Sequence, residues 1–202
     1  MVNNMKKLVC LTLILLLAVA TVLGMAACDD GKPKTYEISV DMQSTSADTS
    51  NLKVRVYALD GTLLEEASLT DNKVQFELVA DSYVATLAGL SEQESYSSIL
   101  LTKKNRQATI TVSESEYDEY IVEDYCFAFT VIMLGAKNVD ELLTNVCNDV
   151  MCRGVGFFGS NVADVTISRG KYDVDVYDAN NREIYHKSFT LDLDKRFYVI
   201  EL

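Results

Sequence analysis

The chain has 202 residues, of which 18 are Lys or Arg and 30 are Asp or Glu, so its formal net charge is −12. Lys6 and Lys7 are the only charged residues before residue 28, which leaves the rest of the chain with a net charge of −14. Such an acidic surface repels nucleic acid and anionic lipid head groups, so it argues against a nucleic-acid-binding protein. It would suit a cationic partner or calcium, although a solvated acidic surface explains it more simply.

The first 28 residues have the pattern of an export signal. Two lysines precede the apolar run Leu8–Leu23, and small residues then lead to Ala27 and Cys28. A positive start, an apolar core and a small-residue exit are typical of secretory signals. The ending Met25-Ala26-Ala27-Cys28 resembles a bacterial lipobox, with Met25 where that family prefers Leu. The resemblance implies cleavage between Ala27 and Cys28 and a diacylglycerol on the Cys28 thiol.

The resemblance also implies a location. The mature chain would be held by lipid on the extracytoplasmic face of the cell membrane. Asp29 resembles the inner-membrane retention signal of enteric-type lipoproteins, which has no meaning in a Gram-positive envelope. Two alternatives stay open: an ordinary secretory signal with a chance cysteine, and an uncut anchor, because the run extended to Ala27 approaches the roughly 20 residues that span a bilayer.

We expect residues 28–35 to form a tether and residues 36–113 to form a first β-sandwich module. Apolar and polar residues alternate there, as in half-buried strands whose successive side chains point to opposite faces. The apolar positions are Ile38, Val40 and Met42; Val54, Val56 and Ala58; Val74, Phe76 and Leu78; and Ala108, Ile110 and Val112. Asp60-Gly61 separates two runs and favours a hairpin turn, because both residues tolerate positive φ. About six or seven strands would suffice for a small sandwich.

Residues 114–120 are acidic and poor in aliphatic side chains, so we expect a linker there. A second β-sandwich module is predicted over residues 121–202, with Cys126–Leu134 as a buried strand. Asn138 has Glu141 three residues later, and apolar residues then recur at helical spacing, which predicts a helix over about 139–151. The predicted fold class is mainly β: two small antiparallel β-sandwich modules, the second with one short α-helix.

The two predicted modules share a weak echo. Val54–Thr70 aligns without gaps on Val174–Thr190 as strand, turn and strand, but period-two sequences match easily, so a true duplication stays open. Val54–Leu87 also resembles transthyretin-like and carboxypeptidase-regulatory-like sandwiches and collagen-adhesin B-type repeats, with Asp81-Ser82-Tyr83 in place of their Gly-x-Tyr. The Lys–Asn isopeptide bond of such repeats is not carried over, because Gln107–Val112 lacks the Asn.

Three cysteines remain after cleavage and lipidation: Cys126, Cys147 and Cys152. An oxidising compartment permits at most one disulfide among them. A helix through Cys147 and Cys152 would place them about 140° apart, so they could bridge only if it ended between them. We therefore expect Cys126 to pair with Cys147 or Cys152. A zinc site formed with His186 is disfavoured, because the cysteine spacing does not match.

Catalytic motifs are scarce. Gly154–Gly159 fits G-x-G-x-x-G, but a predicted helix precedes it and strands follow, which favours a turn over a nucleotide site. His186 is the only histidine and lies in a strand-like run, so a satisfied or exposed strand histidine is favoured over a catalytic triad. No G-x-S-x-G or H-E-x-x-H occurs. We therefore expect no enzyme activity and no cofactor.

Two further clusters have side chains that could form a binding site. One set of oxygen ligands is Asp173, Asp175, Asp178 and Asn180. Outward strand residues near a turn explain it better than calcium, and we expect no metal. Carbohydrate binding would need an exposed aromatic platform. The best cluster for it is Tyr117, Tyr120 and Tyr125.

The sequence therefore favours a lipid-anchored, extracytoplasmic, non-catalytic binding or accessory module of the bacterial envelope. Its partners would be the membrane, through the lipid, and an unknown protein or envelope polymer. One alternative is an envelope enzyme, a hydrolase that uses carboxylates. A solute-binding lipoprotein is less favoured, because the mature chain is short for two lobes and shows no alternating βα pattern.

Overall fold

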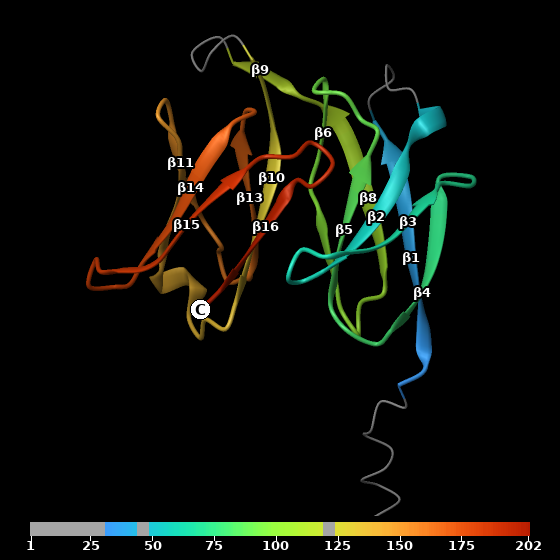
Figure 1. Ribbon diagram of the computed structural model, residues 1–202, viewed down its shortest axis with the longest axis horizontal. Coiled ribbons are helices and arrows are strands. Elements are labelled where there is room, and N and C mark those ends of the chain that lie inside the picture. Colours follow the sequence, from blue (N-terminus) through green and yellow to red (C-terminus); the bar gives the residue numbers. More distant parts are fainter. Residues whose placement is uncertain (1–30, 44–48, 119–123) are drawn as a thin grey trace, which may run out of the picture.

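The computed structural model describes residues 31–43, 49–118 and 124–202, and nearly all of its regular structure is β-strand. The strands form four main sheets, stacked in layers as two sandwiches (Figure 1). This confirms the predicted fold class of β-sandwich modules. In the described part of the chain there is no apolar helix of membrane-spanning length.

The first sandwich has eight strands and one turn of 3-10 helix. Their bounds are β1 (Pro33–Met42), η1 (Thr49–Asn51), β2 (Lys53–Ala58), β3 (Leu63–Ser68), β4 (Lys73–Val79), β5 (Tyr83–Ala88), β6 (Glu94–Tyr96), β7 (Ile99–Leu101) and β8 (Gln107–Glu114). One sheet has the order β4-β1-β8-β6, in which only β1 and β8 are parallel. The facing sheet has the order β3-β2-β5-β7 and is antiparallel throughout.

The alternation seen in the sequence accounts for the core of this sandwich. Ile38 and Val40 on β1 are buried, and they pack in one cluster with Val54 and Val56 from the facing sheet. Since successive side chains of a strand point to opposite faces, the residues between them stay nearer the solvent. Burial of this apolar face holds the two sheets together.

The second sandwich has seven strands, a 3-10 turn and one short strand that precedes it. Their bounds are β9 (Glu116–Asp118), β10 (Asp124–Leu134), η2 (Val139–Glu141), β11 (Leu143–Cys147), β12 (Cys152–Val155), β13 (Val162–Ile167), β14 (Lys171–Tyr177), β15 (Glu183–Thr190) and β16 (Phe197–Glu201). The sheets have the orders β13-β10-β16 and β12-β11-β14-β15, and only β10 and β16 are parallel. The buried strand predicted at Cys126–Leu134 is part of β10.

Two predicted connections contain strands. β1 begins at Pro33, inside the expected tether 28–35. β9 lies in the expected linker 114–120 and pairs with the start of β10. The domain limits at residues 36, 113 and 121 themselves stay a prediction.

The helix predicted over 139–151 is wrong. Only Val139–Glu141 forms a 3-10 turn, and Asn138 makes no capping hydrogen bond with its side chain. The following residues form β11 and β12, which pair as a hairpin, and the Asn148 side chain accepts hydrogen bonds from two backbone N–H groups in the turn. The apolar residues of this short segment fit both the helical period and the strand period. Pairing with β14 selects the strand.

The two sandwiches have the same topology. In chain order, β10, β11, β12, β13, β14, β15 and β16 match β1, β2, β3, β4, β5, β7 and β8 in sheet position and pairing direction. Among the described strands of the first sandwich, only β6 lacks a counterpart in the second. The edge of β16 that corresponds to the β6-bearing edge of β8 therefore has no paired strand in the described part of the chain.

Equivalent side chains support this match. Tyr83 at the start of β5 donates a hydrogen bond to the carbonyl of Val79, and Tyr172 at the start of β14 donates one to the carbonyl of Ser168. Each tyrosine thus ties its strand to the backbone four residues earlier. We call Tyr83 and Tyr172 the corner tyrosines.

The similarity between Val54–Thr70 and Val174–Thr190 comes from two hairpins of the same type. It does not align the equivalent strands of the two sandwiches. It pairs β2–β3 with β14–β15, whereas the topology pairs β2–β3 with β11–β12. Both echo segments contain a hairpin with a bulge at the last residue pairs, and each turn holds one residue with positive φ, Gly61 or Asn181. Similar local backbone geometry selects similar residues in strands that occupy different places.

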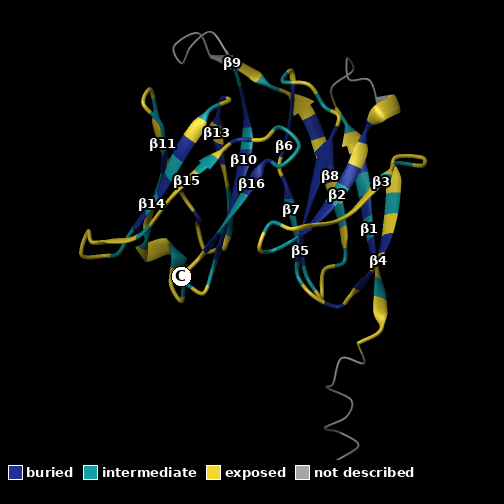
Figure 2. Ribbon diagram, viewed as in Figure 1, coloured by how far each residue is buried: buried dark blue, intermediate teal, exposed yellow. Residues whose placement is uncertain are grey.

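The sandwiches pack together through their inner sheets. Tyr57 and Val84 contact Ile132 and Phe197 in a third buried cluster. For this reason β5 is buried at all six positions, facing its own core on one side and the second sandwich on the other. Figure 2 shows the buried residues concentrated in the inner strands and the exposed ones in outer strands and turns.

Candidate functional site

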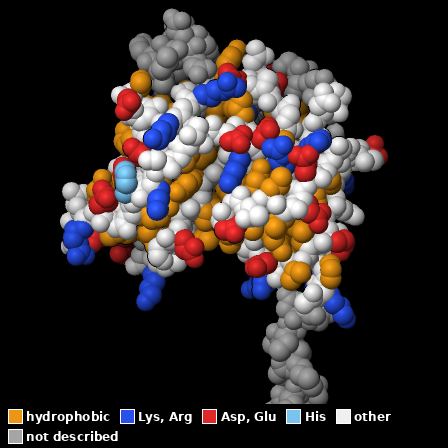
Figure 3. All heavy atoms as spheres, in the orientation of Figure 1, with side chains coloured by type: hydrophobic (Ala, Val, Ile, Leu, Met, Phe, Trp, Pro, Cys, Tyr) orange, Lys and Arg blue, Asp and Glu red, His pale blue; other side chains and the backbone are white. Residues whose placement is uncertain are grey.

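A groove beside β16 is the candidate site. It encloses a hollow of about 290 Å³. It is lined by Leu59, Asp60, Gly61, Tyr185, Lys195, Phe197, Tyr198, Val199 and Glu201. The turn between β2 and β3 forms one wall and β15 contributes to the other, so both sandwiches build the groove. Figure 3 shows hydrophobic side chains gathered along the seam between the two lobes on this face.

Two phenols lie on the wall from the second sandwich. The hydroxyls of Tyr185 and Tyr198 are 3.0 Å apart and share a hydrogen bond. Burial, and then the contact with Tyr198, raises the pKa of Tyr185 above its ordinary value. The Tyr198 ring stacks on Phe189, with 5.0 Å between ring centroids, and Phe189 stacks on Phe129 of the core. The aromatic wall is therefore held by stacked rings that continue into the core.

Charged groups stand at the margins of the groove. Lys195 donates a hydrogen bond of 3.0 Å to the carbonyl of Gly61, and its ammonium lies 5.3 Å from the centroid of the Phe197 ring. Gly61 has a φ of +84°, a conformation that favours glycine, and a Cβ there would displace the end of the Lys195 side chain, whose nitrogen would lie 2.6 Å away. Asp60 and Glu201 add two carboxylates, and Glu201 is exposed.

The loop between β15 and β16 locks the walls in place. Asp194 accepts hydrogen bonds from Arg55 and from the backbone N–H of Gly89, both in the first sandwich. Its carbonyl accepts a further bond from Thr86 on β5. These bonds join the sandwiches beside the groove, so its two walls form one preorganised surface.

Arg196 completes this junction and is fully buried. Its guanidinium donates to the carbonyls of Leu193 at 3.0 Å, Glu94 at 2.7 Å and Ser91 at 3.3 Å. It also lies 4.5 Å from the centroid of the Phe127 ring and 4.9 Å from that of Tyr96. Burial lowers the pKa of Arg196 below its ordinary value. No sequence pattern marks this residue, because a lone Arg in a loop carries no periodic signal.

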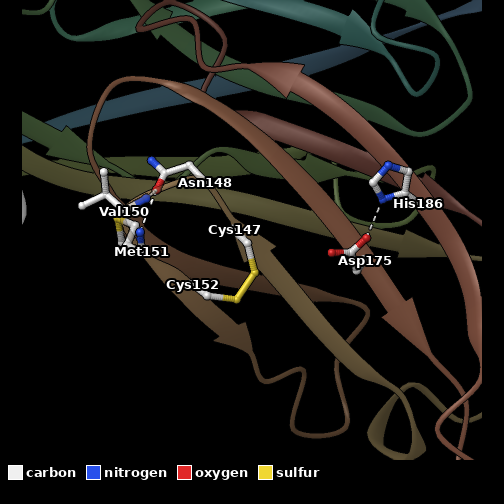
Figure 4. The surroundings of a disulfide bond; sticks show 7 residues. All are labelled: Cys147, Asn148, Val150, Met151, Cys152, Asp175 and His186. Carbon is white, nitrogen blue, oxygen red and sulfur yellow. Dashed lines mark hydrogen bonds and ion pairs between the residues drawn. A yellow bond between two sulfur atoms is a disulfide. The ribbon is translucent and has the colours of Figure 1, made fainter.

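The cysteines pair differently from the expectation. The disulfide joins Cys147 and Cys152, whereas buried Cys126 is not part of it. The two bonded residues face each other across the β11–β12 hairpin, and Cys126 lies on β10 in another sheet. Figure 4 shows the bond between Cys147 and Cys152. The expected pairing with Cys126 assumed a helix through residue 151, and it fails because that helix is absent from the described residues.

His186 lies beside a carboxylate of the neighbouring strand. Its Nδ1 lies 2.6 Å from the Asp175 carboxylate on the neighbouring strand, and the two side chains point toward one another in Figure 4. This contact raises the pKa of His186 above its ordinary value. Ser188 donates its hydroxyl hydrogen to Asp173, so this hydroxyl is not directed at the imidazole. The pairs are cross-strand contacts on an exposed sheet surface.

The acidic cluster and the glycine motif, both disfavoured as sites from the sequence, lie in strands and turns. Asp173 and Asp175 alternate with buried residues on β14, while Asp178 accepts hydrogen bonds from Arg182 in the next turn. Within the described residues, no group of three or more His, Cys, Asp and Glu side chains is placed to hold a metal ion. Gly154–Gly159 spans the end of β12 and a turn before β13, as expected of a turn motif.

Several predicted residues fall outside what the structure describes. Ala27, Cys28 and Tyr120 lie outside the described residues, so the lipidation and cleavage sites stay predictions. Tyr125 lies on β10, where its hydroxyl accepts a hydrogen bond from Gln93 at 3.4 Å. The groove residues were missed as a site, although the strand pattern of Phe197–Leu202 was recognised, because they meet only when the two sandwiches pack.

No protein-family model and no curated protein sequence matches the chain. Several solved structures are similar to the chain, at low identity and low TM-score. A carbohydrate-binding module of family 41 from streptococcal virulence factors is 8% identical, with 83% of this chain and 93% of that chain covered and a TM-score of 0.34. The shaft pilin SpaA of Lactobacillus rhamnosus GG is 6% identical, with coverages of 84% and 97% and a TM-score of 0.32.

The chain also matches the Bacillus anthracis TIE protein at 11% identity, with a TM-score of 0.32. The match covers 85% of this chain but only 34% of that one, so the chain spans about a third of that protein. At these identities and TM-scores, the likenesses carry no conclusion about function.

Proposed function

We propose that the chain is a lipid-anchored, non-catalytic binding or accessory module of the bacterial cell envelope, and that the groove beside β16 is its binding surface. The observation that carries the proposal is the N-terminal signal ending at Ala27-Cys28, five residues before β1 begins at Pro33. Since a residue of extended chain spans at most about 3.6 Å, the sandwich would stand within roughly 20 Å of the lipid.

The cysteine chemistry supports a place outside the cytoplasm. Cys147 and Cys152 form a disulfide, a bond that persists in oxidising compartments and is rare in the cytosol of most bacteria. This support is independent of the signal, because it rests on residues more than a hundred positions away.

The chemistry of the described residues supports binding without catalysis. The sole histidine is held by Asp175, and its neighbour Ser188 by Asp173, so a base and a nucleophile do not meet. The groove instead offers stacked aromatic rings, phenol hydroxyls and carboxylates on fixed walls. Such a mixture of flat apolar surface and a few polar groups is suited to holding a ligand.

The test is the intact mass of the protein extracted from membranes of its native host, beside a Cys28→Ala variant. A mass that fits a chain beginning at an acylated Cys28, absent in the variant, is the expected result. The added lipid should also keep the protein in the membrane fraction after a high-salt wash, whereas the variant should not stay there. An unmodified N-terminus in the native protein would refute the lipid anchor.

A further inference from the structure

The open edge of β16 is the feature from which the inference starts. In the first sandwich the equivalent strand, β8, carries β6 as an antiparallel neighbour, with Glu94 opposite Glu114 and Tyr96 opposite Val112. In the second sandwich the described strands leave this position empty, and the groove lies there. The chain therefore contains its own example of what fills such a position, namely a short extended segment of polypeptide.

The backbone of β16 presents hydrogen-bonding groups to the groove. The carbonyl of Arg196 accepts from Thr130 on β10, and the N–H of Leu202 donates to Leu134 just beyond its end. Alternate residues of a strand direct their backbone groups to the same side, so Tyr198 and Ile200 also face β10. It follows that Phe197, Val199 and Glu201 direct their N–H and C=O groups to the open edge.

The walls leave this edge accessible in the plane of the sheet. Leu59, Asp60 and Gly61 stand on the side of the first sandwich, and Tyr185 stands on the side of β15. The two walls belong to the sheets on either side of the β16 sheet, so a strand between them would lie in that sheet as a new edge strand. Neighbouring strands lie about 4.8 Å apart, so only one extended segment is needed to cover the edge.

We propose that β16 binds an extended segment of a partner protein by β-strand addition, antiparallel to β16, at the edge that corresponds to the one on which β6 pairs with residues 112–114 of β8 in the first sandwich. This proposal deepens the proposed binding function and rests on it. Main-chain hydrogen bonds to Phe197, Val199 and Glu201 supply affinity, and the walls select side chains.

The groove also defines the chemistry of the partner segment. Alternate side chains of an added strand point to opposite walls. On one side they meet Leu59, and on the other the phenols of Tyr185 and Tyr198. Asp60 and Glu201 place two carboxylates at the margins against the one ammonium of Lys195, and this balance favours Lys or Arg flanking an apolar residue in the partner segment. A cationic partner is also the kind of partner that the acidic chain would suit.

The experiment selects random linear peptides displayed on phage against the full, lipid-bearing chain in detergent micelles. Selected peptides are then titrated against wild type, Val199→Pro and Val199→Thr. Proline removes the outward N–H at an edge position, where it breaks no bond to β10, and threonine keeps both the N–H and the branched shape. We expect affinity to fall about tenfold or more for the proline variant and little for the threonine variant.

Hydrogen exchange locates the contact directly. Bound peptide should slow exchange of the Phe197, Val199 and Glu201 amides, and Glu201→Pro should reproduce the loss of affinity at a position with an exposed side chain. Urea unfolding of each variant shows whether it is folded. If Val199→Pro fails to fold, the Glu201→Pro titration and the exchange pattern still decide the question.

Three outcomes would overturn the proposal. Equal binding to the proline and threonine variants, or no peptide that protects β16 amides, would exclude strand addition. If the chain formed a dimer that dissociated in the Val199→Pro variant, the edge would bind a second copy of the chain. If both variants bound envelope polysaccharide equally and Tyr185→Ala did not bind it, the proposed binding function would stand but strand addition would be excluded. An absent lipid would be detected by mass, separately from all of these results.

Discussion

Arg196 provides the sharpest test of how the two sandwiches are joined. Its guanidinium is fully buried, and its hydrogen bonds go to three backbone carbonyls, two of them in the first sandwich. The perturbation is Arg196→Met, which keeps much of the length and apolar stem of the side chain but removes every donor and the charge.

The magnitude depends on two opposing effects. Removing the charge relieves the cost of burying it, and replacement of buried ion pairs by apolar residues is often neutral for that reason. Here the acceptors are backbone carbonyls, which stay in place and lose their donors. Ser91 and Glu94 would each keep a carbonyl without this partner at a cost of about 1–3 kcal/mol, and the contacts with Tyr96 and Phe127 would weaken. After relief of the buried charge, we expect a net loss of roughly 3 kcal/mol.

The assay is urea unfolding followed by circular dichroism for wild type and variant. The matched control is Arg182→Met, which removes an ion pair to Asp178 from an exposed side chain. This control should lose less than about 1 kcal/mol, as is usual for surface ion pairs. If Arg196→Met were as stable as wild type, or more stable, the carbonyl bonds would not outweigh the cost of burying the charge, and the reasoning would be refuted.

Three further predictions concern the disulfide, the histidine and the corner tyrosines. Replacing Cys147 and Cys152 together by Ser should lower the free energy of unfolding by about 2 kcal/mol, since the closed loop is short. Reduced wild type should unfold at the same urea concentration as the double variant, and a difference would count against the pairing. The pKa of His186 lies above 6.5 in the folded chain, so its contact with Asp175 stabilises the fold below pH 6.5, and this contribution is lost as pH rises through the raised pKa. Titration of the imidazole by NMR should show a lower pKa in Asp175→Asn, and an unchanged pKa would exclude the contact. Phenylalanine at either corner tyrosine should cost a similar amount, about 1 kcal/mol, in urea unfolding, and a cost at only one of them would argue against their equivalence.

Local sequence patterns predicted much of the architecture. The alternation around Ile38, Val54 and Phe76 predicted strands that the structure contains, because burial of one strand face imposes a period of two on the sequence. The same pattern could not separate strand from helix near Val146. There a few apolar residues suited both periods, and only pairing with β14 selected the strand.

The cysteine error followed from that ambiguity. Once the segment is a hairpin, Cys147 and Cys152 become cross-strand neighbours, although their spacing in the sequence is unchanged. The Gly-x-Tyr motif, replaced by Asp81-Ser82-Tyr83 in the first sandwich, is present in the second as Gly170-Lys171-Tyr172, at the equivalent strand. A gapless alignment missed this relation because the loops of the two sandwiches differ in length.

By itself, the sequence determined the β-sandwich class, the course of most strands and the expectation of an export signal, since each of these depends on residues close together in the chain. Only the tertiary structure decided the disulfide, the buried Arg196 and the groove at β16. Lys195 and Gly61 are 134 positions apart, and they meet because the inner sheets of the two sandwiches pack face to face. Contacts of that kind depend on the sum of many apolar burials along both sheets, and no single motif encodes them.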